Sequence, residues 1–374
     1  MAMRPYLDEF AGNPSSLHFF GRKSKEAIDE ARKRVAKFLN CSPEEIIFTG
    51  SATEANNLAI FGVVKPFNFV SVRPHIITSS IEHSSVFEPC QVLEDEGAEV
   101  TYLPSTRDGF VKIADLIKAL KKNTVLVSII YANNEIGTIQ PIAEISKIIK
   151  KFRKSEKFPL FHIDAVQGIN YLDCSVEKLG VDLLSLSGQK IYGPKGVGAL
   201  YIKRGVSIAP LIYGGGQEKG LRSGTENVAF IIGLGEAIRQ VLKNKSKIAK
   251  IRSLRNKLYK GILKSVPGIK LNGSMENSLP NILNITFKGV EGEAVELALD
   301  NKGIAVSTGS ACASHDLKPS RVLLAIGLSH EEAHGAIRFS LGRYTAKEEI
   351  DEVLKVLPQI IKRLRKISGY KVKK

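Results

Sequence analysis

Short apolar runs rich in β-branched residues recur between residues 45 and 203, and most of them are separated by helix-like segments. Strands that alternate with helices in this way form a mostly parallel sheet that is covered on both faces. The ligand site of such a sheet lies at the carboxyl ends of its strands. The runs are EIIFTG, HIITSS, EVTYLP, TVLVSIIYA, PLFHIDA, LLSLSG and GALYIK, and the helix-like segments include 51–63, 82–96, 111–122 and 141–154.

The pattern changes after about residue 240 and predicts a second, smaller α+β domain. Its features are a basic helix at 243–264, a strand-like run at 281–287, a Gly/Ser-rich loop around 307–314 and a last helix from about 346. We therefore predict an α/β protein with a large domain over residues 1–240 and a small domain over residues 241–374. A helix at 21–39 is expected to pack on the small domain.

Composition argues against several classes of protein. No run of about 18 apolar residues occurs and the chain does not start with an apolar signal core, so we expect neither a membrane protein nor a secreted one. No CxxC pair occurs, which disfavours a disulfide framework or a zinc ribbon and favours reduced thiols in the cytoplasm. The cysteines are Cys41, Cys90, Cys174 and Cys312.

The net charge of +16 could attract nucleic acid, an anionic surface or an acidic protein. The basic residues are, however, spread along amphipathic helices, where a solvated polar face explains them equally well. No nucleic-acid-binding motif accompanies the charge, so nucleic acid is not expected as the main partner.

The first strand runs into a helix start with the sequence FTGSATEANN at 48–57. Ser51 and Glu54 have the spacing of a capping box, which predicts a helix whose first backbone N–H groups point off the edge of the sheet. Such a helix start can hold a phosphate or another anion. It can equally be an ordinary capped helix, and no nucleotide-binding glycine pattern decides between the two.

Polar side chains also follow three later strands. One histidine or one capping aspartate is more often structural than catalytic, but four strand ends that bring polar groups to one rim are harder to explain as caps alone. The residues are His83 after HIITSS, Asn133, Asn134 and Glu135 after TVLVSIIYA, and Asp164 and Gln167 after PLFHIDA.

Lys190 ends another apolar strand, in SLSGQKIYGP, at the same rim. An amine near cations and apolar walls has a lowered pKa and becomes a nucleophile. A surface lysine is the default for a chain with 54 Lys and Arg residues. Here the small neighbouring residues, the glycine-rich turn and the nearby phosphate cradle favour a covalent bond to pyridoxal phosphate.

The small domain offers two candidates. Cys312 lies in VSTGSACASHD, where the small neighbours favour an exposed thiol over a buried structural one. Arg338 lies in AIRFSLGR and could bind a carboxylate through both of its terminal nitrogens, or form a structural ion pair.

The segment His330 to His334 fits the zinc motif HExxH, with Glu331 as the base and Ser329 as the helix cap. No later histidine supplies a third ligand, and Gly335 weakens the helix. A zinc site is therefore the less favoured interpretation, and we expect no metal.

These segments together resemble the cysteine desulfurases, which are pyridoxal-phosphate enzymes of the fold-type I, class V aminotransferase group. Each segment alone is weak evidence, but their joint occurrence in this order over nearly the whole chain is specific. The longer GSAC loop resembles the branch that serves iron–sulfur cluster assembly. The segments are GNPSSLH, SATEANNLAI, EHSSV, ANNEIGTIQP, HIDAVQ, SGQKIYGPKGVGALY, GGGQEKGLRSGTEN, GSACAS and IRFSLGR.

The resemblance implies a role for each matching residue. Lys190 would bond to the cofactor, His83 would stack on its ring, and Asp164 would face its pyridine nitrogen so that the ring withdraws electrons. Gln167 would reach the ring hydroxyl. The phosphate would be held by Ala52, Thr53, Ser187 and Gln189, with Thr225 from the other subunit of a homodimer, and the substrate by Asn13, Asn134 and Arg338.

The activity that the resemblance implies is conversion of L-cysteine to L-alanine, with transfer of the sulfur to Cys312 as a persulfide. The sulfur would then pass to an acceptor protein or scaffold for iron–sulfur cluster, thio-cofactor or tRNA synthesis. A selenocysteine lyase is the alternative within the enzymes. A non-catalytic sulfur-transfer scaffold of the same fold is the alternative outside them.

Two features depart from the family pattern. Gln189 stands where the family usually has histidine, and an amide can donate a hydrogen bond to phosphate but cannot carry charge. The start, MAMRPYLDEF, stands where the family has an additional opening strand and an Ala-Thr-Thr-type segment. We expect either a naturally short protein or one whose start has been lost or misassigned.

Overall fold

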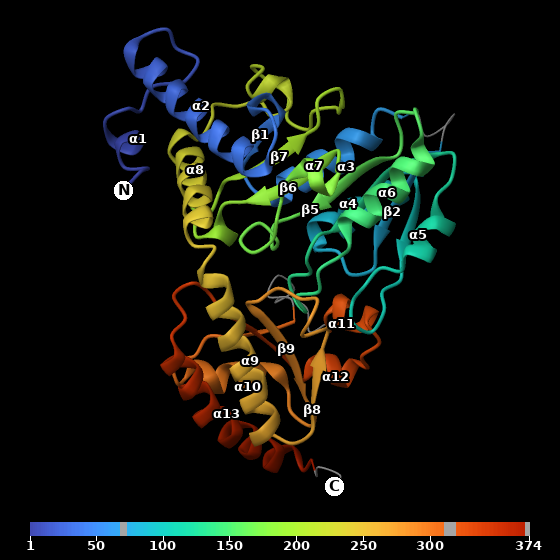
Figure 1. The fold of residues 1–374 in the computed structure, drawn as a ribbon, viewed down its shortest axis with the longest axis vertical. Helices are drawn as coiled ribbons and strands as arrows, with labels where there is room; N and C mark the ends of the chain where they lie inside the picture. Colours follow the sequence, from blue (N-terminus) through green and yellow to red (C-terminus); the bar gives the residue numbers. More distant parts are fainter. Residues whose placement is uncertain (68–72, 310–318, 371–374) are drawn as a thin grey trace. The chain divides into compact units, whose positions relative to one another are not determined.

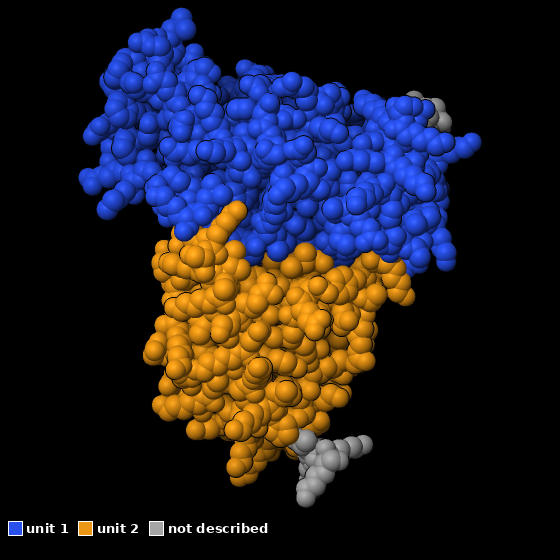
Figure 2. Space-filling model, in the orientation of Figure 1, with its two compact units in different colours: residues 1–103, 113–131, 140–243 blue, residues 104–112, 132–139, 244–374 orange. Residues whose placement is uncertain are grey.

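The computed structural model describes residues 1–67, 73–309 and 319–370. The chain forms two compact units (Figure 2). Unit 1 comprises residues 1–103, 113–131 and 140–243, and unit 2 comprises residues 104–112, 132–139 and 244–374. The main division near residue 243 lies close to the predicted one, but two short segments from the first half of the chain belong to unit 2.

Unit 1 contains a sheet of seven strands in the described residues, in the order β1-β7-β6-β5-β4-β2-β3 (Figure 1). Strand β7 runs antiparallel to both of its neighbours, β1 and β6, and the other pairs are parallel. Strands β1 and β6 therefore point the same way, and their carboxyl ends share a rim with those of β2, β4 and β5. The strands are β1 (Ile46–Thr49), β2 (His75–Ser79), β3 (Glu99–Leu103), β4 (Thr124–Ile130), β5 (Leu160–Asp164), β6 (Leu183–Ser187) and β7 (Gly198–Ile202).

Helices surround this sheet, and every predicted strand and connecting helix is present (Figure 1). Helix α3 packs on strands β1, β4, β6 and β7 and on α4, and most of its residues are buried. The helices are α1 (Pro5–Asp8), α2 (Phe19–Leu39), α3 (Ala52–Val64), α4 (Ser84–Asp95), α5 (Ile113–Ala119), α6 (Ile142–Arg153), α7 (Val176–Leu179) and α8 (Val228–Lys243), with 3-10 turns η1 (Pro43–Glu45), η2 (Gln189–Ile191) and η3 (Glu218–Gly220).

Helix α2 belongs to unit 1. It lies along α8, where Gly235 has no side chain and so lets the Ala31 methyl group come within 2.9 Å of its Cβ position. Arg32 of the same helix forms an ion pair with the buried Glu218, with nitrogen–oxygen distances of 2.6 and 2.9 Å. Small residues that permit close helix packing, together with this ion pair, fix α2 in unit 1.

Unit 2 contains an antiparallel sheet in the order β10-β11-β9-β8. Residues 132–139 are attached to the segment that precedes β9 by an isolated bridge between Thr138 and Ser278 and by the hydrogen bond from Leu279 N to Gly137 O, 2.8 Å long. Its elements are α9 (Lys247–Ser265), β8 (Ile269–Asn272), β9 (Ile282–Phe287), α10 (Gly292–Asp300), β10 (Ser307–Thr308), α11 (Arg321–Ala325), α12 (His330–His334), β11 (Ala336–Ser340) and α13 (Lys347–Ser368).

Among the residues that the structure describes, no helix combines the length and the apolar character needed to span a lipid bilayer.

His162 lies on the central strand β5 and is fully buried. Its two ring nitrogens lie 2.8 Å from the Ser128 hydroxyl and 2.9 Å from the Ser185 hydroxyl. Burial lowers the pKa of the imidazole from 6.5 to about 3. The folded protein therefore holds this histidine neutral at pH values at which the unfolded chain binds a proton.

The free energy of unfolding should fall as the pH is lowered from 6.5, because below that value the unfolded chain binds a proton that the folded protein does not. From the shift of His162, the loss between pH 7 and pH 4 is on the order of 3 kcal/mol. A His162→Gln variant should show a shallower pH dependence in urea unfolding of the cofactor-free protein. The exposed His330→Gln variant is the matched control, and identical pH curves for wild type and His162→Gln would contradict the prediction.

Candidate active site

The helix start after β1 is capped by its own side chains. The Ser51 hydroxyl accepts a hydrogen bond of 3.1 Å from the backbone N–H of Glu54. The Glu54 carboxylate in turn accepts one of 2.9 Å from Gly50 N, so the predicted cap forms but reaches back one residue further than a standard capping box. The N–H groups of Ala52 and Thr53 precede the first intrahelical bond and are oriented for an anion.

Gly198 on β7 lets this helix start approach the sheet closely. A Cβ atom at Gly198 would lie 2.6 Å from the carbonyl carbon of Ser51 and 2.8 Å from the carbonyl oxygen of Leu186, distances that no real side chain tolerates. Gly198 pairs with Ser187, the last residue of β6. The start of α3 and the end of β6 therefore meet at one corner, as the predicted phosphate cradle requires.

Lys190 lies in the 3-10 turn η2 that follows β6. The turn is closed by a hydrogen bond of 3.0 Å from Gly188 N to Val197 O and one of 2.9 Å from Gly193 N to Gly188 O. The side chains of Lys190 and Gln189 are exposed. The sequence predicts apolar walls around the Lys190 amine, whereas in the structure this side chain is exposed at the rim.

Asp164 and His83 occupy the neighbouring strand ends. Asp164 ends β5, is only 4% exposed, and accepts hydrogen bonds of 3.0 Å from Val166 N and 2.8 Å from the Asn56 side-chain amide. His83 caps helix α4, where its Nδ1 accepts a hydrogen bond of 3.1 Å from Ser85 N. Unit 1 therefore brings together an anion cradle, a buried carboxylate, an imidazole and an exposed amine along the rim predicted from the strand ends.

Asn134 and Arg338 lie together in unit 2. An Arg338 Nη1 hydrogen donates to the backbone oxygen of Asn134 over 2.9 Å. Arg338 lies on β11, where it pairs with Asn284 and Ser307. The side-chain Oδ1 of Asn134 is buried and has no hydrogen-bond partner among the described residues. A guanidinium and a primary amide in this arrangement can bind a small carboxylate.

Glu135, the next residue, is a buried acid that connects two parts of unit 2. The Ser320 hydroxyl donates to its carboxylate over 2.5 Å, and the Cβ position of Gly309 lies 3.6 Å from the same oxygen. Glu135 therefore contacts residues on both sides of segment 310–318. That segment carries Cys312 and the predicted exposed loop, which lie outside the described residues.

Burial raises the pKa of the Glu135 carboxyl. The hydrogen bond from Ser320 and the positive charges of Arg338 and Arg321 act in the opposite direction and limit the shift. Sequence reasoning identified Glu135 as a polar residue at a strand end but missed its contact with Ser320, because 185 residues separate the two.

The other predicted residues are placed as follows. The exposed Asn13 accepts a hydrogen bond of 2.9 Å from Ser15 N within its own loop. Gln167 is half-buried just beyond β5. The exposed Thr225 lines a cavity of about 240 Å³ together with Gly50 and Arg222.

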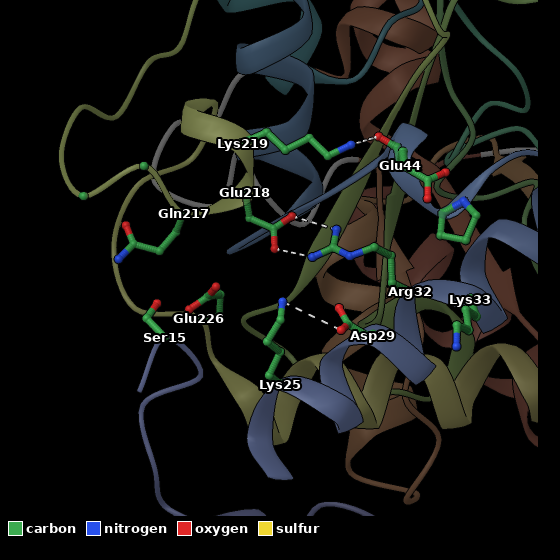
Figure 3. A pocket seen from close by; sticks show the side chains of 13 residues that line it. Ser15, Lys25, Asp29, Arg32, Lys33, Glu44, Gln217, Glu218, Lys219 and Glu226 are labelled. Atoms are coloured by element: carbon green, nitrogen blue, oxygen red, sulfur yellow. Dashed lines mark hydrogen bonds and ion pairs between the residues drawn. The ribbon is translucent and has the colours of Figure 1, made fainter. Parts of the chain in front are cut away.

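A larger cavity in unit 1 has a volume of about 590 Å³, and none of the predicted site residues lines it (Figure 3). Two pairs of its charged side chains point toward one another: Arg32 pairs with Glu218, and Lys25 lies 3.8 Å from Asp29. Because these charges neutralise each other, the cavity does not offer a site of one sign to a ligand. It is lined by Ser15, Lys25, Asp29, Arg32, Lys33, Pro43, Glu44, Gly215, Gly216, Gln217, Glu218, Lys219 and Glu226.

The HExxH segment forms the short helix α12, which Ser329 caps through a hydrogen bond of 3.1 Å from Glu332 N. Glu332 also forms an ion pair with Lys270 at 2.9 Å. In the described part of the chain no group of His, Cys, Asp and Glu side chains is arranged to hold a metal ion.

The chain is similar to known proteins over nearly its whole length. The family model described as aminotransferase class-V matches residues 1–353. A protein of Dictyoglomus turgidum named cysteine desulfurase IscS is 52% identical over 371 residues, which covers 99% of this chain and 92% of the relative. Cysteine desulfurase IscS 1 of Archaeoglobus fulgidus is 46% identical over 368 residues, which covers 98% and 94%.

Two solved structures are similar in sequence and in fold. A structure titled NifS-like protein is 41% identical with a TM-score of 0.90, over 97% of this chain and 95% of the other. A structure titled SspA in complex with cysteine is 37% identical with a TM-score of 0.80, over 92% of this chain and 95% of the other.

Glu135 offers a direct test of the buried contact in unit 2. Because burial favours the uncharged form, Glu135→Gln should change the free energy of unfolding by less than about 1 kcal/mol. Glu135→Ala should cost about 2 kcal/mol, because the Ser320 hydroxyl still accepts from Leu323 N but loses the acceptor for its own proton. Urea unfolding of the cofactor-free protein measures both, with the exposed Glu276→Ala as control. Equal losses in the Gln and Ala variants would show that the contact with Ser320 has no energetic importance.

Proposed function

The chain belongs to the class-V aminotransferase family and is a pyridoxal-phosphate-dependent cysteine desulfurase, and we propose that Lys190, Asp164 and Cys312 are the residues with which it converts L-cysteine to L-alanine. The observation that carries this assignment is the rim of unit 1, where the anion cradle, the buried carboxylate and the exposed amine occur together. Relatives named cysteine desulfurase favour this activity over a selenocysteine lyase and over a non-catalytic scaffold.

The residues of the rim fit the cofactor. The N–H groups of Ala52 and Thr53, with the hydroxyl of Ser187, suit a phosphate, and the missing side chain at Gly198 lets the start of α3 approach the end of β6 closely. Gln189 adds an amide donor to this set. Thr225 would come from a second copy of the chain, so the working protein would be a homodimer.

Three residues would hold the rest of the cofactor. The Asp164 carboxylate would face the ring nitrogen, Gln167 the ring hydroxyl, and His83 one face of the ring. When bound, pyridoxal phosphate supplies an electron-withdrawing ring that stabilises negative charge at the α-carbon of the substrate. Lys190 Nζ would form the covalent bond to the cofactor, because the Lys190 side chain is exposed at the rim and can be reached from there.

The substrate is held through its carboxylate. Arg338 and the side-chain NH₂ group of Asn134 would donate hydrogen bonds to it, and the two residues already lie together, because Arg338 Nη1 donates to the backbone oxygen of Asn134. The exposed Asn13 is a further substrate contact in this proposal. Lys190 Nζ, once free, would take the proton from the α-carbon of L-cysteine.

Sulfur transfer completes the reaction. The Cys312 thiolate attacks the substrate sulfur, so a sulfur–sulfur bond forms while the substrate bond between Cβ and sulfur breaks. The electron pair of that bond stays with the carbon fragment, which gains a proton and leaves as L-alanine. The persulfide on Cys312 would then pass its outer sulfur to an acceptor, and the net charge of +16 would favour an acidic protein or an iron–sulfur scaffold.

Replacement of Cys312 separates substrate binding from sulfur transfer. Cys312→Ala should still change the visible absorption of the bound cofactor when L-cysteine is added, but sulfide release should fall by at least about 100-fold because no thiolate accepts the sulfur. The measurement is a sulfide assay in the presence of a reducing thiol.

Cys41→Ala is the matched control, because burial raises the pKa of the Cys41 thiol to about 12 and leaves it protonated at neutral pH. It should retain full sulfide release. Undiminished release by Cys312→Ala would overturn the assignment of this residue.

A further inference from the structure

Two buried polar residues, Asn56 and Ser85, lie between Asp164 and His83 and have no role in the reaction described above. Asn56 is fully buried on helix α3, and Ser85 is 7% exposed in the first turn of α4. We propose that they are positioning residues, which bridge Asp164 to His83 and hold the neutral His83 ring with its proton on Nε2. The catalytic significance of this bridge rests on the proposed function, but its hydrogen-bond geometry does not.

The bridge begins at Asp164. One carboxylate oxygen accepts from Val166 N over 3.0 Å, and the other accepts from the Asn56 amide nitrogen over 2.8 Å. A carboxylate only accepts hydrogen bonds, so the nitrogen of Asn56 and not its oxygen must face it. Asp164 therefore fixes which way the Asn56 amide points.

The second hydrogen of that amide fixes the next residue. The Asn56 nitrogen also lies 2.8 Å from the Ser85 hydroxyl oxygen, which therefore accepts from it. The single proton of the Ser85 hydroxyl is then available for another acceptor. His83 Nδ1 is that acceptor, at 2.8 Å.

The same ring nitrogen accepts a second hydrogen bond, of 3.1 Å, from Ser85 N. An imidazole nitrogen that accepts hydrogen bonds carries no proton, so the proton of the neutral ring is on Nε2. The donor and the acceptor of each hydrogen bond from Asp164 through Asn56 and Ser85 to His83 thus follow from the carboxylate of Asp164. His83 is left with one donor, Nε2–H, for a cofactor or substrate atom.

The position of Asn56 suggests that this bridge is retained at a cost in stability. Its neighbours on α3 include the fully buried Ala55 and Ala59 and the nearly fully buried Leu58. Its own Oδ1 is buried with no hydrogen-bond partner among the described residues, which is unfavourable. An apolar side chain would avoid that penalty but could not connect Asp164 to Ser85.

The first test reads the ring directly in the cofactor-free protein. Long-range ¹H–¹⁵N NMR spectra distinguish the two tautomers, with the His83 signals assigned by a His83→Gln variant. Wild type should show His83 protonated on Nε2. Ser85→Ala, which keeps only the backbone donor to Nδ1, should show a measurable Nδ1-protonated fraction, and the exposed neighbour Ser84→Ala should not.

The second test asks whether the two residues act as one unit. Asn56→Leu and Ser85→Ala should each lower kcat for L-cysteine by about tenfold with KM changed less than about twofold, and the double variant should be no worse than about tenfold. Ser84→Ala is again the control, because the exposed Ser84 side chain takes no part in the bridge. If Asn56→Leu does not fold, Ser85→Ala and the NMR spectra still decide the question.

Two results would overturn the proposal: a wild-type His83 ring protonated on Nδ1, or kinetic losses that multiply to about 100-fold in the double variant. Failure of the proposed function would look different. A wild-type protein without desulfurase activity would leave the NMR prediction unchanged, because that experiment needs neither cofactor nor substrate.

Discussion

Gly198 is the position on which the arrangement of the site depends. Because it has no side chain, the carbonyl carbon of Ser51 lies 2.6 Å from where its Cβ would stand, and helix α3 begins against the end of β6. That approach places the N–H groups at the start of α3 beside Ser187. It also brings Asn56, one turn further along the helix, into contact with Asp164 on β5. The absence of a side chain at Gly198 thus lets helix α3 lie where its first N–H groups form the anion cradle and its Asn56 contacts the buried Asp164 carboxylate.

Much of this arrangement follows from the sequence. The alternation of apolar runs and helical segments predicts the strands and helices of unit 1, and the shared direction of the strands predicts the common rim. Local sequence does not determine which distant segments pair. The antiparallel insertion of β7, the packing of α2 along α8 and the transfer of residues 132–139 to unit 2 all depend on contacts between segments far apart in the chain. Asn56 was missed because a buried polar residue within an apolar helix gives no periodic signal.

Buried polar groups with orienting partners occur among the candidate site residues of both units. Asp164 and Asn56 in unit 1, and Glu135 in unit 2, each carry polar atoms out of contact with water. Each has specific partners that determine how it is oriented, and in each case one partner comes from a distant segment. Burial of a polar group is unfavourable, so apolar residues at these positions would cost less stability. These three residues therefore indicate where the protein keeps side chains in a fixed orientation at the expense of stability.

The visible absorption spectrum of the purified protein, loaded with pyridoxal phosphate and then mixed with L-cysteine, tests the central assignment most directly. Wild type should show an absorption band of the bound cofactor that shifts when L-cysteine is added, and Lys190→Ala should show an altered band in the absence of substrate. A wild-type protein with no such band, even with cofactor in excess, would contradict the assignment of Lys190 and of the rim of unit 1 as the active site.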